Sequence, residues 1–142
     1  MTTPSEPPAI AERELCGLVN GLAQRIADHV RQCAVTLGLT AAQATALREM
    51  TGPMTMRELA ERMSCEPSNA TFVIDKLEKQ GLVERRAHPT DRRAKHLVLT
   101  PEGSSARDRL LDLLVQDSPL AGLNSLQQRT LQGLLEQATA RP

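Results

Sequence analysis

The sequence predicts a mainly α-helical (α+β) fold in which several helices surround one small β-hairpin. Apolar residues recur at three- and four-residue spacing near both ends of the chain, which is typical of amphipathic helices. In the middle of the chain, Thr residues followed three positions later by Glu or Gln mark the starts of further helices. A short alternating stretch on either side of a polar loop indicates the hairpin. With 142 residues, of which 40% are apolar, the chain can form one domain with a core of its own.

The N-terminal part predicts a tail and a long helix. Residues 1–8 are rich in Pro and Ser and are expected to be disordered. Residues 10–37 carry an apolar stripe at helical spacing, and Gly38 ends the helix. The stripe consists of Leu15, Leu18, Val19, Leu22, Ile26, Val30 and Cys33.

Two short helices follow, each introduced by a capping signal. Thr40 and Gln43 have the spacing of a capping box, in which each residue satisfies a free backbone N–H of the other. Thr55 and Glu58 repeat this spacing before a helix over residues 56–63.

A further helix and the hairpin come next. Pro67 is tolerated in the first turn of a helix, so a helix is expected over residues 67–80, ending at Gly81. Its inward face is predicted to consist of Ala70, Val73, Ile74 and Leu77. Strands are predicted over residues 82–87 and 96–100.

The C-terminal segment predicts two more helices. Thr100 is expected to cap the first of them, with Pro101 at its first position. Ser125 and Gln128 have capping-box spacing and are predicted to start the last helix.

Composition excludes several classes of protein. Three cysteines without a C-x-x-C pair argue against a disulfide framework and a structural zinc site. The N-terminus lacks the basic and apolar regions of a signal peptide, and the longest uncharged run, residues 32–47, is too short to span a bilayer. We therefore expect a cytoplasmic protein with no membrane partner.

Single-stranded nucleic-acid binding and catalysis are also disfavoured. Phe72 is the only aromatic residue of the Phe, Tyr and Trp type, whereas single-strand binders stack bases on several such rings. No H-E-x-x-H, G-x-S-x-G or phosphate-loop motif is present, so we expect no enzyme, no cofactor and no metal. A metal site formed by His88, Asp91 and His96 is a weaker alternative.

Charge is concentrated in one part of the chain. Net charge is zero, but residues 76–96 hold seven basic and three acidic side chains and therefore carry +4. The rest of the chain carries −4, which predicts an acidic body with one basic protrusion.

Two short helices joined by a three-residue turn and followed by a basic hairpin make up a winged helix-turn-helix. Its second helix has the size of the major groove of DNA. Ser68, Asn69 and Thr71 lie at the start of this helix and suit contacts to base edges and phosphates. The same residue types also satisfy free N–H groups at helix starts, so both roles stay open.

The chain resembles the MarR family of bacterial transcriptional regulators in its motifs. These read L-A-E-R-M from Leu59, P-S-N-A-T from Pro67, D-K-L-E-K-Q-G-L-V-E-R from Asp75, P-T-D-R-R-A-K from Pro89 and L-V-L-T-P-E-G from Leu97. The D-R-R turn followed by L-x-L-T-x-x-G is the specific part. The resemblance covers nearly the whole chain.

The resemblance implies a DNA-binding lobe over residues 40–100 and dimerisation helices over residues 10–37 and 101–142. It implies a homodimer that binds a pseudo-palindromic double-stranded DNA operator as a repressor. A small-molecule effector would bind in a crevice between the dimer helices and the lobe and thereby release the repressor from the operator.

The resemblance also implies roles for the wing residues. Arg93 would enter the minor groove, and the carboxylate of Asp91 would orient the guanidinium groups of the wing. The residues expected to contact backbone phosphates are Arg85, Arg86, Arg92 and Lys95.

Three alternatives remain from the sequence. The position of Cys16, early in the first helix, resembles that of the reactive cysteine in the hydroperoxide-sensing branch of the family. That branch uses tyrosines to hold its thiolate, and this chain has none, so a packed thiol is favoured. Cys33 is expected in the core, and Cys65 lies in the turn of the helix-turn-helix. A winged-helix metal sensor and a protein-interaction module are the other two alternatives.

Overall fold

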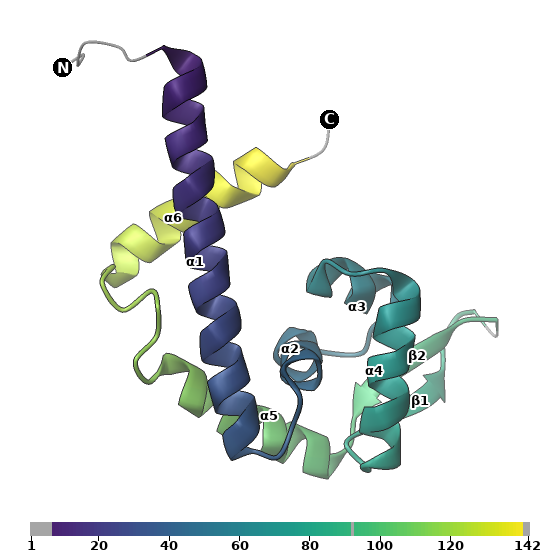
Figure 1. Ribbon diagram of the computed structural model, residues 1–142. Helices are drawn as coiled ribbons and strands as arrows, with labels where there is room; N and C mark the ends of the chain where they lie inside the picture. The colour runs from purple at the N-terminus through teal and green to yellow at the C-terminus, as the bar shows by residue number, and fades with distance from the viewer. Residues whose placement is uncertain (1–6, 92, 141–142) are drawn as a thin grey trace. The chain divides into compact units, whose positions relative to one another are not determined.

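A computed structural model of the chain describes residues 7–91 and 93–140 (Figure 1). Its elements, in chain order, are α1 (Pro8–Thr36), α2 (Ala41–Glu49), α3 (Met56–Met63), α4 (Pro67–Lys79), β1 (Val83–Ala87), β2 (Lys95–Leu99), α5 (Pro101–Val115) and α6 (Ser125–Thr139). The predicted mainly helical fold with a β-hairpin wing is confirmed.

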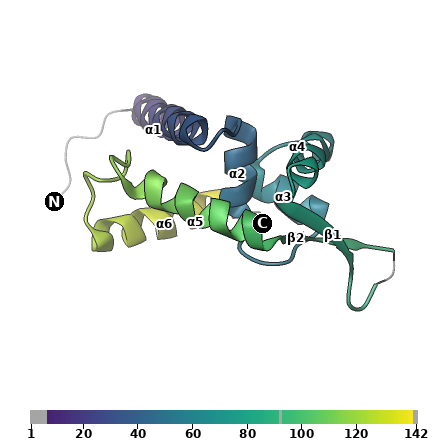
Figure 2. The same cartoon turned by 90° about the horizontal axis from the view of Figure 1, so that it is seen from below.

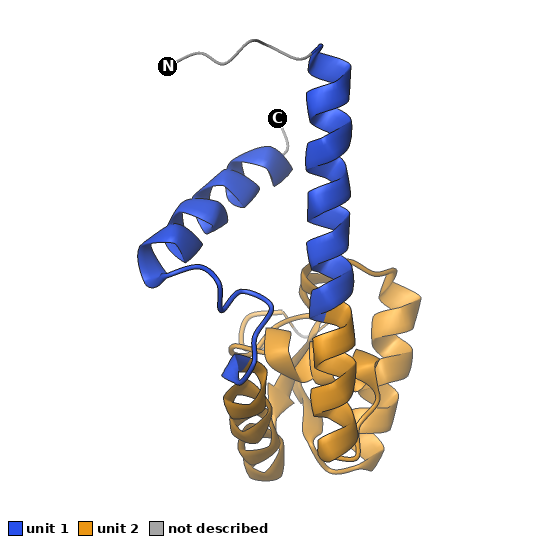
Figure 3. Cartoon of the chain, turned by 60° about the vertical axis from the view of Figure 1, so that its left-hand side comes forward, with its two compact units in different colours: residues 1–26, 115–142 blue, residues 27–114 orange. Residues whose placement is uncertain are grey.

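The chain divides into two compact units (Figure 3). The first unit consists of residues 1–26 and 115–142, and the second consists of residues 27–114. Each unit is described by itself below. No helix among the described residues is long and apolar enough to cross a membrane.

The second unit contains the hydrophobic core. Its helices α2, α3 and α4 pack on one another, and the hairpin lies beside α4 (Figure 1). All four residues predicted for the inward face of α4 are buried. The largest fully buried side chains are Leu47, Met50, Met54, Leu59, Ile74, Leu77, Val83, Leu97 and Leu110. Burial of this apolar surface is the main force that holds the unit together.

The hairpin is a two-stranded antiparallel sheet. Val83 pairs with Leu99 at its base and Ala87 pairs with Lys95 near its tip. Met54, in the connection between α2 and α3, adds two backbone hydrogen bonds with Leu97, of 3.2 and 2.7 Å. The connection therefore fixes β2 to the helices.

Helix starts in the second unit follow the predicted caps in part. At α2, Gln43 N–H donates to Thr40 Oγ1 at 3.1 Å, and Thr40 N–H donates to Gln43 Oε1 at 2.9 Å. At α3, Glu58 N–H donates to Thr55 Oγ1 at 3.2 Å, but the carboxylate of Glu58 accepts from the Thr55 hydroxyl instead of its N–H. The second arm of the predicted capping box at α3 is therefore absent.

A close junction joins α5 to the turn between α4 and β1. Thr100 Oγ1 donates to the carbonyl oxygen of Gly81 at 2.6 Å and accepts from Gly103 N–H at 3.0 Å. A Cβ atom added to Gly103 would lie 1.9 Å from the carbonyl oxygen of Leu82. Only glycine fits this position, which gives a physical reason for the last residue of the L-x-L-T-x-x-G motif.

The described part of the first unit contains no hydrophobic core. None of its described residues is buried, although it carries large apolar side chains. Those that are exposed are Ile10, Leu15, Leu18, Val19, Val115, Leu126, Leu134 and Leu135. Inside the unit, Leu22 and Ile26 of α1 and Leu131 of α6 line an apolar cavity of about 370 Å³.

The predicted start of α6 is wrong by one residue. The cap is Asn124, whose side chain accepts from Gln127 N–H at 2.9 Å, while Asn124 N–H donates to Gln127 Oε1 at 2.9 Å. Ser125 is therefore the first helical residue. The amide of Gln128 donates to the carbonyl oxygens of Leu120 and Leu123.

Candidate nucleic-acid interface

The exposed start of α4 presents short polar side chains. Ser68 and Asn69 are exposed, and among the described residues neither side chain has a hydrogen-bond partner. Thr71 is half-buried and its hydroxyl donates to the carbonyl oxygen of Pro67 at 2.9 Å. The N-cap of α4 is Glu66, which makes no side-chain cap. Ser68 and Asn69 therefore do not cap this helix, and their donors and acceptors are available to a ligand.

Phe72 lies on the same exposed face and was not singled out from the sequence as a binding residue. Its side chain is 62% exposed. The ammonium of Lys76, one turn later, lies 4.7 Å from the ring centroid. The predicted inward face of this helix already leaves Phe72 outside the core, and the structure adds that its ring is largely exposed.

Arg85 on β1 points its guanidinium group toward α4. It forms an ion pair with the carboxylate of Asp75, and its Nε lies 3.6 Å from Glu78 Oε2. These ion pairs join β1 of the wing to α4, the second helix of the helix-turn-helix, called the recognition helix below. The guanidinium group of Arg85 thus already has two carboxylate partners. Its contact with phosphates stays a prediction.

The other basic residues of the strands are more exposed. Arg86 pairs with Glu84 at 3.0 Å on its own strand. Lys95 is exposed and has no ion-pair partner among the described residues. Both remain predictions as phosphate contacts.

The wing loop extends beyond the strands (Figure 2) and is ordered by two side chains. His88 Nδ1 accepts from the backbone N–H groups of Thr90 and Asp91, each at 3.1 Å. The carboxylate of Asp91 accepts from the backbone N–H of Arg93 at 3.0 Å. This contact shapes the backbone of the turn. The expected role of Asp91 in orienting guanidinium groups of the wing stays a prediction.

Arg93 itself is exposed, and its side chain pairs with no carboxylate in the part of the chain that the structure describes. Arg92, predicted as a phosphate contact, lies outside the described residues. An unpaired guanidinium group at the tip of a wing is available to a nucleic acid.

The wing also holds two histidines close together. The ring centroids of His88 and His96 lie 4.3 Å apart. Within residues 7–91 and 93–140, no group of three His, Cys, Asp or Glu side chains could hold a metal ion. The alternative of a metal site with Asp91 therefore finds no assembled ligand set there.

The three cysteines differ in environment. Cys16 is exposed, so the expectation of a packed thiol is wrong for the single chain. Cys65 is half-buried. Cys33 is buried, as predicted, and this burial raises the pKa of its thiol and disfavours the reactive thiolate.

His29 does not activate Cys33. His29 Nε2 lies 2.8 Å from the carbonyl oxygen of Leu114, which can only accept, so this nitrogen carries the proton. The Cys33 sulfur lies 3.9 Å from the same nitrogen, which then has no free lone pair to take the thiol proton.

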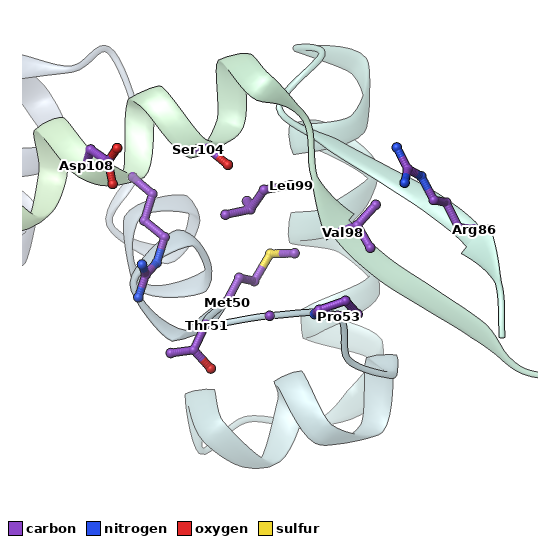
Figure 4. A pocket seen from close by; sticks show the side chains of 10 residues that line it. Met50, Thr51, Pro53, Arg86, Val98, Leu99, Ser104 and Asp108 are labelled. Carbon is purple, nitrogen blue, oxygen red and sulfur yellow. The ribbon is translucent and has the colours of Figure 1, made fainter. Parts of the chain in front are cut away.

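A pocket of about 400 Å³ lies within the second unit (Figure 4). Its apolar part includes Met50, Pro53 and Leu99, and its polar part includes Arg86 of β1 and Asp108 of α5. The size and the mixed lining suit a small molecule with a polar group.

Arg107 also lines this pocket. It donates to the carbonyl oxygens of Leu47 and Arg48 at 2.8 and 3.0 Å. It thus adds side-chain donors to two carbonyl groups at the C-terminal end of α2, next to the pocket.

Comparisons with known sequences find similarity to transcriptional regulators. The model of the MarR family matches residues 39–95. The transcriptional repressor MdtR of Bacillus subtilis is 33% identical over 95 residues, which are 66% of this chain and 61% of that protein. The transcriptional repressor MprA of Escherichia coli is 46% identical over 46 residues, or 32% of this chain and 26% of that protein. The chain thus spans less than two thirds of the length of these relatives.

Solved structures with the same fold cover most of the chain. A mutant of MarR from E. coli complexed with operator DNA has a TM-score of 0.72 at 24% identity, covering 95% of this chain and 100% of that one. BpsR of Bordetella bronchiseptica, whose DNA binding is regulated by 6-hydroxynicotinic acid, has a TM-score of 0.73 at 23% identity, with coverage of 89% and 99%. A MarR-family protein of Mycobacterium tuberculosis in complex with p-aminosalicylic acid has a TM-score of 0.67 at 27% identity, with coverage of 89% and 98%.

Proposed function

Because the MarR family model matches residues 39–95, we propose that this chain is a transcriptional regulator of that family that binds double-stranded DNA as a homodimer. It acts as a repressor in the cytoplasm and not as an enzyme. The observation that carries the proposal is the exposed start of α4, where Ser68 and Asn69 have free hydrogen-bonding groups beside a basic wing.

The two parts of the interface have different tasks. The start of α4 reads base edges in the major groove, where each base pair presents its own pattern of donors and acceptors. Arg93 at the wing enters the adjacent minor groove, whose negative potential attracts a guanidinium group. Arg86, Arg92 and Lys95 contact phosphates, which adds affinity without sequence preference.

The homodimer follows from the first unit. Its described residues include none that is buried, although the apolar stripes of α1 and α6 are long. A second copy of the chain covers these stripes and brings a second lobe to the DNA, so the operator is a pseudo-palindrome.

A small molecule releases the dimer from DNA. The pocket in Figure 4 combines apolar walls with Arg86 and Asp108, and two structural neighbours are described with aromatic acids. An acid bound there would replace Glu84 as the partner of Arg86. Arg86 belongs to a wing strand, so a ligand that binds it changes the charge and position of the wing.

Selection from a pool of random duplexes with the full chain tests the proposal. We expect enrichment of an inverted repeat and a linear fall of log affinity with log salt concentration, because phosphate contacts release counterions. A pool that stays random, or a binding constant independent of salt, would contradict the proposal.

Replacement of all three cysteines distinguishes ligand control from redox control. In a variant with Cys16, Cys33 and Cys65 changed to Ala, release of the selected duplex by the effector should be unchanged. Peroxide-dependent release that disappears in Cys16→Ser alone would favour the redox alternative.

A further inference from the structure

Phe72 lies near the middle of the exposed face of α4. The helix buries Ala70, Val73, Ile74 and Leu77. At 100° per residue, the side opposite these four residues contains Ser68, Phe72, Asp75 and Lys79. By the same geometry, Asn69 and Thr71 lie on its two flanks. Phe72 is thus more central to the groove-facing surface than two of the residues predicted from the sequence.

The ring of Phe72 is exposed and contacts the ammonium of Lys76. It is 62% exposed, so the free protein leaves a large apolar surface in water. The ammonium of Lys76 lies 4.7 Å from the ring centroid, which favours one ring position through a cation–π contact. An oriented ring loses less conformational freedom when it binds, and this favours a specific contact.

Apolar surface in the major groove comes from one base. All four bases present donors or acceptors there, but only thymine adds a methyl group, at C5. We propose that Phe72 is a specificity-determining residue that contacts the methyl group of a thymine in each half-site. The proposal rests on the proposed DNA-binding function.

The thymine lies close to the base pair that Asn69 reads. Residues three positions apart on a helix have Cβ atoms about 5–6 Å apart, so Phe72 and Asn69 reach neighbouring base pairs. Each half-site therefore combines an amide contact from Asn69 with a methyl contact from Phe72.

Replacement of thymine by deoxyuridine tests the inference, because it removes the methyl group and keeps the base pair. The probes are duplexes selected by the full-length dimer from a random pool, with one thymine per half-site replaced in turn. For the wild type, we expect one position at which affinity falls about fourfold per half-site, the factor that corresponds to about 0.8 kcal/mol for one buried methyl group. For Phe72→Ala, deoxyuridine and thymine should bind alike at that position.

Two control variants separate this contact from other effects. Phe72→Leu keeps apolar surface and should retain part of the preference for thymine. Asn69→Ala changes a neighbour on the same helix and should keep the full deoxyuridine effect. Because Phe72 is exposed, circular dichroism of each variant should match the wild type.

Three results would overturn the inference. In the first, duplexes with deoxyuridine bind as well as those with thymine at every position. In the second, Phe72→Ala loses affinity on replacement of thymine by deoxyuridine by the same factor as the wild type, which would indicate an effect on DNA shape and not a contact with Phe72. Selection that yields no preferred duplex would already refute the DNA-binding function on which the inference rests.

Discussion

Arg85 couples the recognition helix to the wing at the level of single residues. Its guanidinium group contacts the carboxylates of Asp75 and Glu78 on the exposed side of α4. In a DNA complex these carboxylates would lie near phosphates, and like charges repel. We therefore expect Arg85 to favour DNA binding by neutralising them.

Loss of this neutralisation has a testable consequence. Arg85→Ala should weaken DNA binding about tenfold at low salt, or about 1.4 kcal/mol, for all sequences alike. Asp75→Asn added to Arg85→Ala should restore part of the loss, because it removes one of the exposed negative charges. Fluorescence anisotropy with a labelled duplex at several salt concentrations measures both effects, and a double variant no better than Arg85→Ala would contradict this role.

Arg93 and Asn69 should fail in different ways, because they are proposed to read different grooves. Arg93→Ala should cost about 1–3 kcal/mol per subunit, mainly at A·T-rich positions that flank the half-sites. Asn69→Ala should relax discrimination at one or two base pairs within each half-site. Binding to a set of single-base operator variants at fixed salt separates the two patterns. Wild-type affinity and specificity in Arg93→Ala would mean that the wing tip makes no DNA contact.

Site residues could be predicted from the sequence where the chemistry is local. The place of Ser68 and Asn69 on the exposed start of α4 follows from the amphipathic pattern, but that their side chains do not cap the helix is seen only in the structure. The ion pair of Arg85 with Asp75 could not be predicted, because it depends on how β1 packs beside α4. The contact of Asp91 with a backbone N–H has the same origin, since the shape of the turn decides which donor its carboxylate reaches.

At the scale of elements, the start of a helix is predicted from local capping signals, and these signals were sufficient at α2 but not at α6. The capping box of Thr40 and Gln43 is formed as predicted. At α6, both Asn124–Gln127 and Ser125–Gln128 have the required spacing, so the sequence alone does not distinguish them. The preceding turn decides, because the carbonyl groups of Leu120 and Leu123 bind the Gln128 amide.

The junction of α5 with the turn after α4 predicts a strong glycine requirement. Gly103→Ala should lower the free energy of unfolding by about 3 kcal/mol, the upper part of the usual range for overpacking, because the new Cβ meets backbone atoms of Leu82. Gly133→Ala is the control: it lies within α6 with no atom near its added Cβ, and it should stabilise by about 0.5–1 kcal/mol. Urea unfolding followed by circular dichroism measures both. Equal stability of Gly103→Ala and the wild type would contradict the tight junction.

At the scale of the whole molecule, apolar surface is divided unevenly between the two units. The buried apolar residues lie between Val30 and Leu110, within the second unit. The periodicity of residues 10–37 predicts the helix correctly, but it does not reveal whether another part of the same chain or a second copy covers the stripe. That distinction depends on tertiary packing, which a helical pattern does not encode.

Charges placed in the first unit should break the proposed dimer. Leu18 and Leu134 are 73% and 58% exposed, so Leu18→Glu and Leu134→Glu should preserve the fold of the second unit while shifting the protein toward monomers. Sedimentation equilibrium measures the shift, and affinity for the selected duplex should fall with it. Val35→Glu is a matched control, because Val35 is 72% exposed but belongs to the second unit. A dimer that survives both substitutions in the first unit would exclude this surface as the interface.

None of the residues 7–26 and 115–140 of the first unit is buried, so we expect the order of this unit to depend on mass action. A segment that is stabilised only by a partner gains stability with the concentration of that partner. The thermal midpoint of the terminal helices should therefore rise as the protein is concentrated, while that of the winged lobe should respond less. In a cell, the amount of binding-competent regulator would then grow faster than linearly with the number of chains at low expression, so small changes in its synthesis are amplified at its operator.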